Sequence, residues 1–163
     1  MDIKTRSAAD MPTSAFRLLL HAGALALALT AGSAAAQGTS GVDCPQPRFT
    51  DKAPEDFLAR TNPLQADAEN LAAGARLFAE QRRGAACTAC HGVRGDGHGP
   101  MSSMFKPPPR NFGCTKTIND IPDGQLFWVI KFGSPGTSMP PHLHLGDEDI
   151  WRLVQHLRNL ARR

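Results

Sequence analysis

The feature that most limits how this chain can fold is the run Cys87-Thr88-Ala89-Cys90-His91, with two thiols and an imidazole in five residues. The spacing C-x-x-C-H is the signature of covalent c-type haem attachment. A thioredoxin-like C-x-x-C would need a preceding strand and a βαβ context, and neither is visible. Zinc would need a second Cys or His pair at ligand spacing, and the pair His142 and His144 is poorly spaced for it. The motif therefore predicts a fold built around a haem.

The first 36 residues predict an export signal that is removed from the working protein. Lys4, Arg6 and Arg17 precede an apolar run over 18–29, and the run ends near the small residues Ala34-Ala35-Ala36 of a signal-peptidase site. Twelve residues fall short of the roughly 20 that cross a bilayer. We therefore expect cleavage after Ala36, a periplasmic location and no membrane span in the mature chain.

The size and charge of the rest of the chain exclude several classes of protein. Residues 37–163 are 127 residues, enough for one domain with a modest core but not for a multidomain enzyme. The full chain has 18 Lys and Arg against 15 Asp and Glu, and the mature part has 15 against 13. Nucleic-acid binding needs clustered positive charge, which this balance does not suggest. We expect a small exported domain that binds no nucleic acid.

Three helices can be predicted from apolar periodicity and from aspartates that can cap them. An aspartate before an apolar run with period 3.6 accepts a hydrogen bond from a free backbone N–H and so marks a helix start. The predicted helices are 68–82 after Asp67, 124–131 after Asp123 and 148–160 after Asp147. The stretch between the first two is rich in Gly and Pro and has no clear period. The pattern therefore indicates helices joined by irregular loops.

Four segments of the chain resemble the class I, single-haem branch of the c-type cytochrome family. They are Cys87–Gly92, Gly95–Pro100, Pro107–Phe112 and Gly133–Pro141, within a resemblance that covers about 68–163. The resemblance implies an all-α cytochrome c fold, with three to five helices and Gly/Pro-rich loops around one covalently bound haem c. The expected parts are a signal peptide over 1–36, an N-terminal extension over 37–66 and a cytochrome c domain over 67–163.

The resemblance also implies how the haem is held. Cys87 and Cys90 would form thioethers to the two vinyl groups, and His91 would be the proximal iron ligand. The carbonyl group of Pro100 would accept the Nδ1 hydrogen of His91, a bond that orients the ring and raises its basicity. Met139, 48 residues after His91, would be the sixth ligand, in a loop stiffened by prolines.

Other distal ligands stay open at this point. His142 or His144 could take the place of Met139 and give bis-histidine ligation. Met101 and Met104 follow the glycine-rich loop so closely that we expect them to pack in the loop or at the haem edge.

Two residues are expected to bind the haem propionates. Arg110 follows three prolines that restrict the chain, and its guanidinium can hold a carboxylate with two parallel hydrogen bonds. Trp128 is the next candidate, through its indole N–H.

The first and last helices are expected to cross at close quarters, as they do in the family. Gly74 and Phe78, four residues apart, look like the pair at that crossing, where glycine removes the Cβ that would hold two backbones apart. The alternative is a merely tolerated helix glycine, which costs up to about 1 kcal/mol against alanine. His156, on the last helix, is expected at the surface or partly buried.

The extension over 37–66 departs from the minimal family pattern. Cys44 and Cys114 are the two thiols left once a haem takes Cys87 and Cys90. Unused thiols of exported proteins tend to pair, so we expect a structural disulfide that ties the extension to the domain, with two free thiols as the alternative. A loop of 70 residues closed in this way is worth roughly 4 kcal/mol in the chain-entropy description.

A haem with histidine and methionine ligands has no open position for a substrate, so the resemblance implies outer-sphere electron transfer. We expect a monomeric electron carrier, not an enzyme, which exchanges electrons with periplasmic redox proteins or a membrane-bound oxidase or reductase. The alternative is a catalytic haem subunit of a periplasmic oxidoreductase, for instance one that oxidises sulfur compounds. The sequence leaves the partners, the potential and the pathway open.

Overall fold

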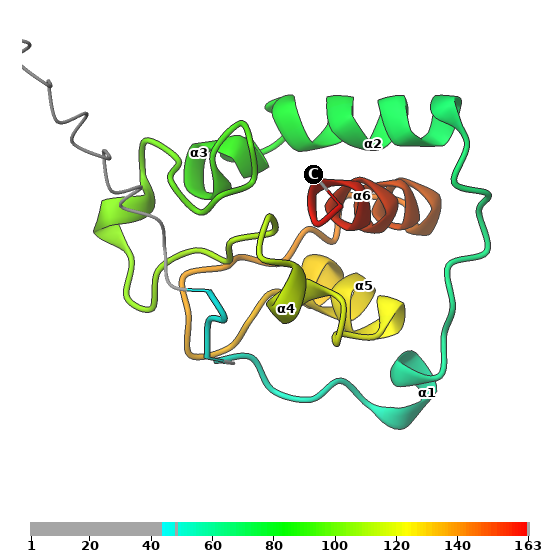
Figure 1. Ribbon diagram of the computed structural model, residues 1–163, viewed down its shortest axis with the longest axis horizontal. Coiled ribbons are helices and arrows are strands. Elements are labelled where there is room, and N and C mark those ends of the chain that lie inside the picture. The colour runs from blue at the N-terminus through cyan, green and yellow to red at the C-terminus, as the bar shows by residue number, and fades with distance from the viewer. Residues whose placement is uncertain (1–43, 48, 163) are drawn as a thin grey trace, which may run out of the picture. The chain divides into compact units, whose positions relative to one another are not determined.

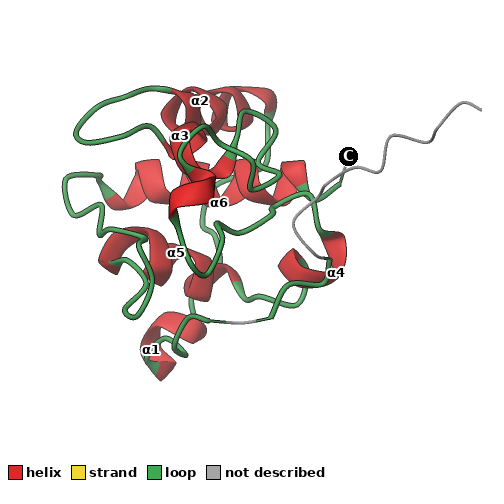
Figure 2. Ribbon diagram, turned by 90° about the vertical axis from the view of Figure 1, so that its left-hand side faces the viewer, coloured by secondary structure: helices red, strands yellow, loops and turns green. Residues whose placement is uncertain are grey.

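The computed structural model describes residues 44–47 and 49–162, so the predicted signal peptide lies outside the described residues. The chain divides into two units, Met1–Gln37 and Gly38–Arg163, and all described residues belong to the second. These residues form helices and loops and contain no strand, which confirms the all-α prediction (Figure 2). None of the helices in this part of the chain is long and apolar enough to cross a membrane.

The described part of the chain has six α-helices and one 3-10 helix, more than the three to five predicted. In chain order they are α1 Glu55–Leu58, α2 Ala68–Ala79, α3 Cys87–His91, η1 Ser102–Met104, α4 Thr115–Ile118, α5 Asp123–Phe132 and α6 Asp147–Leu160. The additional helices, α1, α3 and α4, have only four or five residues. Helices of one turn are too short to show a periodic pattern and depend on tertiary contacts.

The first predicted helix starts as expected and ends early. The side chain of Asp67 accepts a hydrogen bond of 2.8 Å from the backbone N–H of Asn70, which confirms Asp67 as the cap of α2. The helix stops at Ala79 rather than near Arg82, because Glu80 takes an extended backbone. The residues over 80–85 are all exposed, so no buried contact extends the helix.

The predicted caps of α5 and α6 are wrong. Asp123 and Asp147 are the first residues inside their helices, and neither helix has a side-chain cap. Both carboxylates form ion pairs instead. Asp123 Oδ1 accepts from Arg158 Nη2 at 2.7 Å, and Asp147 pairs with Lys131. A negative charge in the first turn still favours each helix through the helix dipole.

Helix α6 lies between α2 and α5, and α1 packs on the other side of α5 (Figure 1). Helix α6 contributes a large part of the core among the described residues, with six buried side chains: Ile150, Trp151, Leu153, Val154, Leu157 and Leu160. These positions repeat with the period of a helix and face both neighbours. The core thus holds α5, which forms part of the site described below, against the crossing of α2 and α6.

The crossing of α2 and α6 occurs at Gly74, as the resemblance implied. A Cβ built on Gly74 would lie 2.2 Å from the carbonyl oxygen of Arg152 and 3.0 Å from Cβ of His156. One turn later, the ring centroid of Phe78 is 5.2 Å from that of His156. His156 is therefore buried, with 6% of its surface exposed, and the expectation of a surface or partly buried histidine is wrong. The close approach of the two backbones encloses this side chain.

Arg158 connects α6 to the segment between α4 and α5. Its guanidinium donates to the Ile118 carbonyl oxygen at 2.5 Å, to the Ile121 carbonyl oxygen, and to Asp123 Oδ1 at 2.7 Å. The charged group thereby satisfies carbonyl groups at the end of α4 and places the start of α5. This network fixes the position of α5 relative to the last helix.

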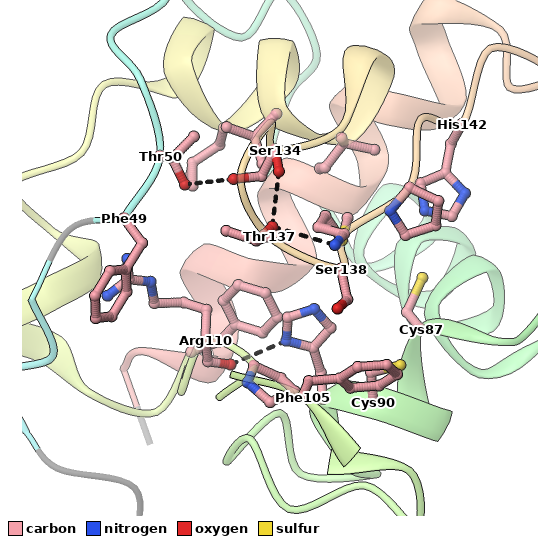
Figure 3. A pocket seen from close by; sticks show the side chains of 18 of the residues that line it. Phe49, Thr50, Cys87, Cys90, Phe105, Arg110, Ser134, Thr137, Ser138 and His142 are labelled. Carbon is pink, nitrogen blue, oxygen red and sulfur yellow. Dashed lines mark hydrogen bonds between the residues drawn. The ribbon is translucent and has the colours of Figure 1, made fainter. Parts of the chain in front are cut away.

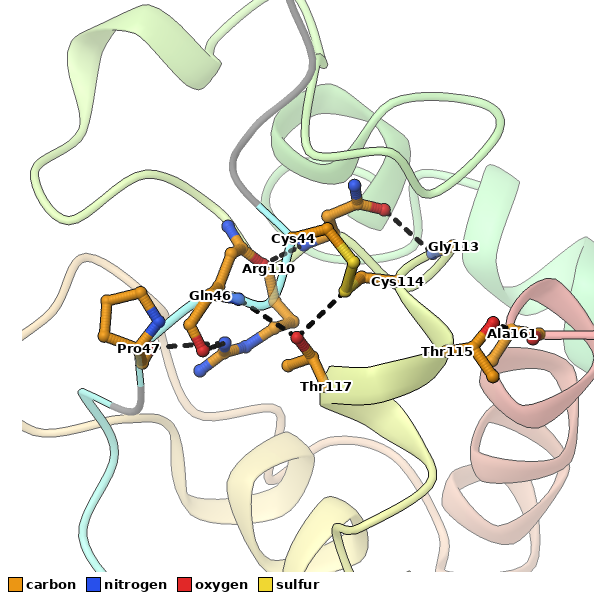
Figure 4. The surroundings of a disulfide bond; sticks show 10 residues. Cys44, Gln46, Pro47, Arg110, Gly113, Cys114, Thr115, Thr117 and Ala161 are labelled. Carbon is orange, nitrogen blue, oxygen red and sulfur yellow. Dashed lines mark hydrogen bonds between the residues drawn. A yellow bond between two sulfur atoms is a disulfide. The ribbon is translucent and has the colours of Figure 1, made fainter.

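Cys44 and Cys114 form a disulfide, with their Cα atoms 5.7 Å apart, which confirms the predicted pairing (Figure 4). The bond joins the extension to the residue that precedes α4. Cys114 is buried and Cys44 is exposed. The extension is thus held covalently against the domain at its first described residue.

Candidate haem site

A cavity of about 490 Å³ lies beside α3, within the range of volumes typical of sites for organic ligands (Figure 3). Its walls come from α3, the proline-rich segment 105–112, α5, the loop over 134–144 and the extension. Most of the lining side chains are apolar. Cys87, Cys90, His91 and Met139, the four residues predicted to hold a haem, all line this cavity. A smaller hollow of about 30 Å³ is lined by Cys87, His91, Met139 and His142, so these side chains face a common space.

The two cysteines of α3 are free thiols that lie about one helical turn apart and both face the cavity. Burial raises the pKa of the Cys87 thiol to about 11, and burial also raises the pKa of Cys90. Cysteines that exchange disulfides have lowered pKa values and react as thiolates. The pair therefore does not resemble a redox-active C-x-x-C, whereas two neutral thiols at this spacing suit thioether bonds to a haem.

His91 is buried and held in one orientation. Its Nδ1 lies 3.0 Å from the carbonyl oxygen of Arg110, and its ring stacks on Phe112 with 4.5 Å between centroids. Burial lowers the pKa of His91 to about 4, so the imidazole is neutral at pH 7. With Nδ1 committed to a carbonyl oxygen, Nε2 of the neutral ring is left to ligate a metal.

The carbonyl group that accepts the hydrogen bond from His91 Nδ1 belongs to Arg110. The expectation that Pro100 provides this carbonyl group is therefore wrong. Pro100 is exposed, in a loop that folds back on the α3 backbone. The N–H groups of Gly97, Gly99 and Met101 donate to carbonyl groups of α3 at 2.8–3.0 Å. Gly99 allows this approach, since a Cβ there would lie 2.3 Å from the Ala89 carbonyl oxygen. The loop is thus bound to the α3 backbone, and the proline-rich segment passes beside the imidazole instead.

Hydrogen bonds hold the loop that carries Met139. The backbone N–H of Ser134 donates to the Met139 carbonyl oxygen at 3.1 Å, and the N–H of Met139 donates to Thr137 Oγ1 at 3.2 Å. Thr137 Oγ1 in turn donates to the Ser134 carbonyl oxygen at 2.8 Å. These bonds, together with the neighbouring prolines, hold the thioether side chain at the cavity wall.

The other candidate distal ligands divide into two groups. His142 and His144 also line the cavity, with ring centroids 5.8 Å apart. Burial and the neighbouring His144 lower the pKa of His142, so it is a neutral imidazole that could ligate a metal. Met101 and Met104 do not line the cavity, and Met104 is 71% exposed. The expectation that these two methionines stay in the loop agrees with their positions.

The structure does not bring Trp128 to the cavity. Helix α5 presents Gln125, Leu126, Val129 and Ile130 to the cavity. Trp128 lies on another face of the helix, and its ring centroid is 6.3 Å from that of Phe132. The indole N–H is therefore not placed to bind a propionate, contrary to the expectation.

Arg110 does line the cavity, on the side of the extension. Its Nη1 donates to the carbonyl oxygens of Gln46 and Pro47, at 3.4 and 3.3 Å. The guanidinium thus lies at the cavity wall and holds the extension.

Gln125 is a site residue that the sequence reasoning missed. It is 3% exposed and lines the cavity, and its Oε1 accepts from the Ala53 N–H at 2.8 Å. Its Nε2 donates to the Asp51 carbonyl oxygen at 3.1 Å. One signal could have found it, since Gln125 is a polar residue between apolar positions of the predicted helix 124–131. A buried carboxamide needs partners, and the extension provides them.

The cavity and its residues fit a covalently bound haem. Its apolar walls suit a porphyrin, the two thiols face it from one turn of helix, and the buried imidazole is neutral with its Nδ1 already bound. No curated protein sequence matches the chain. Among solved structures, the chain is similar to a chain of the reducing HAO-like protein complex of Kuenenia stuttgartiensis, with 25% sequence identity and a TM-score of 0.52.

That similarity covers 63% of this chain and 48% of the other, so this chain spans about half the length of that protein. Residues 71–161 match the family model described as Cytochrome c. The matched range contains the C-x-x-C-H helix, the proline-rich segment, the loop of Met139, all of α6 and most of α2. The chain therefore belongs to the cytochrome c family, whose members carry covalently bound haem c.

Proposed function

We propose that the protein is a periplasmic electron carrier with one haem, bound through Cys87 and Cys90 and ligated by His91 and Met139. The observation that carries this proposal is that all four side chains line one cavity, with His91 oriented by the Arg110 carbonyl group. A haem bound there supplies a one-electron Fe(III)/Fe(II) couple. His91 and Met139 would both be bound to the iron, which would leave no position for a substrate, and the haem would then supply outer-sphere electron transfer.

The Cys44–Cys114 disulfide supports export, because structural disulfides form and persist in oxidising compartments such as the periplasm. The redox partners would then be other periplasmic proteins or the periplasmic face of a membrane oxidase or reductase. We expect a monomer that meets these partners briefly.

A second candidate function is a haem subunit of a periplasmic oxidoreductase complex. The similarity to a chain of a reducing HAO-like complex favours it. Carbon monoxide separates the two, because a ferrous haem with both axial ligands in place does not bind it and a catalytic haem does.

Covalent attachment tests the haem assignment. The mature protein should keep its haem through acid–acetone extraction and stain for haem in a denaturing gel, and its mass should equal residues 37–163 plus one haem. A Cys87→Ala, Cys90→Ala variant should fail all three tests, while a Cys44→Ser, Cys114→Ser variant should still keep one covalent haem in each. Extraction of the haem from the unaltered protein would contradict covalent attachment, and a mass with two haems would contradict the count.

Replacing Arg110 with leucine should lower the midpoint potential without loss of the haem. The substitution removes a positive charge from the cavity wall, and ferric haem, with one more positive charge than ferrous haem, gains relative stability. A spectroelectrochemical titration measures the shift. Arg94→Leu is the control, because Arg94 is exposed, pairs with Asp96 and lies away from the cavity. An unchanged potential in the Arg110 variant would place the propionates on other residues.

A further inference from the structure

We propose that the N-terminal extension, through residues 44–47 and 49–53, forms a fixed wall that closes the propionate edge of the haem to water and to small redox reagents. The inference rests on the proposed haem site. Gln46, Pro47, Phe49 and Thr50 of these two segments line the cavity. A minimal cytochrome domain starting near residue 67 would lack all four and would leave this side of the cavity open.

The extension faces the side of the cavity opposite the cysteines. Figure 3 shows Cys87 and Cys90 on one side of the cavity, and Phe49 and Thr50 on the other. In a haem, the two vinyl groups and the two propionates lie on opposite edges of the ring. Thioethers to the cysteines would therefore direct the propionate edge toward the extension.

The first anchor of the wall is the disulfide together with Gln46 (Figure 4). The backbone N–H of Gln46 donates to Thr117 Oγ1 at 3.1 Å. Its side chain accepts from the Asn111 N–H at 2.7 Å and donates to the Pro109 carbonyl oxygen at 3.3 Å. Gln46 is thus bonded on both sides of Arg110, whose own carbonyl group orients His91. The extension and the proximal ligand are held by the same short segment.

The second and third anchors lie on the distal loop and on α5. Thr50 Oγ1 is 3.0 Å from Ser134 Oγ, in the loop that carries Met139. Ala53, which is 4% exposed, donates its N–H to the buried Gln125 side chain, and Gln125 donates to the Asp51 carbonyl oxygen. Three separate elements therefore hold the wall, and a wall held in this way stays closed during redox cycling.

The polar groups at this wall suit propionates. Carboxylates taken out of water need donors and a nearby positive charge. The hydroxyl groups of Thr50 and Ser134 and the guanidinium of Arg110 lie at this side of the cavity. Water exclusion at this edge disfavours the ferric form, which carries the additional positive charge, and so raises the potential.

The test compares release of the wall with a change that leaves it in place. A Cys44→Ser, Cys114→Ser, Gln46→Ala variant loses the first anchor, and Thr50→Val loses the second with the disulfide intact. Lys52→Ala is the control, because Lys52 is exposed on the same extension, does not line the cavity and forms a surface ion pair with the exposed Glu55. The measurements are the midpoint potential and the rate constants of oxidation by hexacyanoferrate(III), an anion, and by tris(phenanthroline)cobalt(III), a cation.

Release should lower the potential and raise both rate constants severalfold, while Lys52→Ala should match the unaltered protein. A rise with both reagents shows access and not a change of charge. The ferric near-infrared band of a thioether-ligated haem is recorded first in every protein. Absence of this band from the unaltered protein contradicts the proposed ligation by Met139. The comparison of rate constants still tests the proposed wall, because it does not depend on which residue is the sixth ligand. Unchanged potential and rates in variants that keep the band and their helical circular dichroism overturn the proposal. If the triple variant does not fold, Thr50→Val decides by the same measurements.

Discussion

Replacing Gly74 with alanine is expected to lower the free energy of unfolding of the haem-loaded protein by about 2–3 kcal/mol. Helix propensity alone predicts the opposite sign, since alanine is favoured over glycine inside a helix by about 1 kcal/mol. The added Cβ would lie 2.2 Å from the carbonyl oxygen and 2.8 Å from the carbonyl carbon of Arg152. Both are backbone atoms of α6, so the clash cannot be relieved by turning a side chain. The helices would have to move apart, which loosens the packing of Phe78 against His156.

Chemical denaturation followed by far-ultraviolet circular dichroism measures this effect. Ala72→Gly is the matched control, because Ala72 is an exposed residue of the same helix. It should cost about 1 kcal/mol through propensity alone. Destabilisation by both substitutions, although they change helix propensity in opposite directions, would show that packing dominates at Gly74. A more stable Gly74→Ala protein would instead show that the two helices can separate at little cost.

The fold could be predicted from the sequence where the signal was local. The helices α2, α5 and α6 bury one face each, so their apolar periodicity placed them to within a few residues. The caps proposed for α5 and α6 failed because Asp123 and Asp147 pair with Arg158 and Lys131, which come from other elements. Capping rules consider neighbours in the chain, whereas these partners are brought close only by the tertiary structure. The short helices α1, α3 and α4 have too few residues to carry a pattern.

The candidate site, too, could be predicted where the signal was local and not where it depends on tertiary contacts. The C-x-x-C-H motif and the resemblance predicted the residues that line the cavity from α3 and from the distal loop. The residue whose carbonyl group accepts from His91 could not be predicted in this way. Every residue has a backbone carbonyl group, so the sequence does not distinguish Pro100 from Arg110, and both follow His91 within 20 residues. The wall formed by the extension lies outside the resemblance. In the sequence, only the two cysteines left over from haem attachment predicted that the extension is tied to the domain. The roles of Gln46 and Gln125 follow from their contacts in the structure.

Replacing Met139 with alanine is expected to abolish the ferric near-infrared band and to let the ferrous haem bind carbon monoxide. Met139 lines the cavity together with His91, on a loop whose backbone is held by Ser134 and Thr137. A thioether is a weak ligand, so its bond to iron depends on a loop that is already in place. Loss of the thioether should lower the potential, because methionine ligation raises it. Met139→His should keep six ligands and also lower the potential, since imidazole favours ferric iron more than a thioether does.

Met104→Ala and Met101→Ala are the controls for loss of a methionine, because neither residue lines the cavity. Both should keep the band and the potential of the unaltered protein. The fold should survive in Met139→Ala, since the backbone bonds of its loop do not involve the thioether. A Met139→Ala protein that keeps the band, the potential and its resistance to carbon monoxide would place the sixth ligand elsewhere. His142 would then be the first candidate, because it faces the same hollow as His91 and its imidazole is neutral. That outcome would contradict the proposed His/Met ligation, and the potential should then be lower than that of a haem with a methionine ligand.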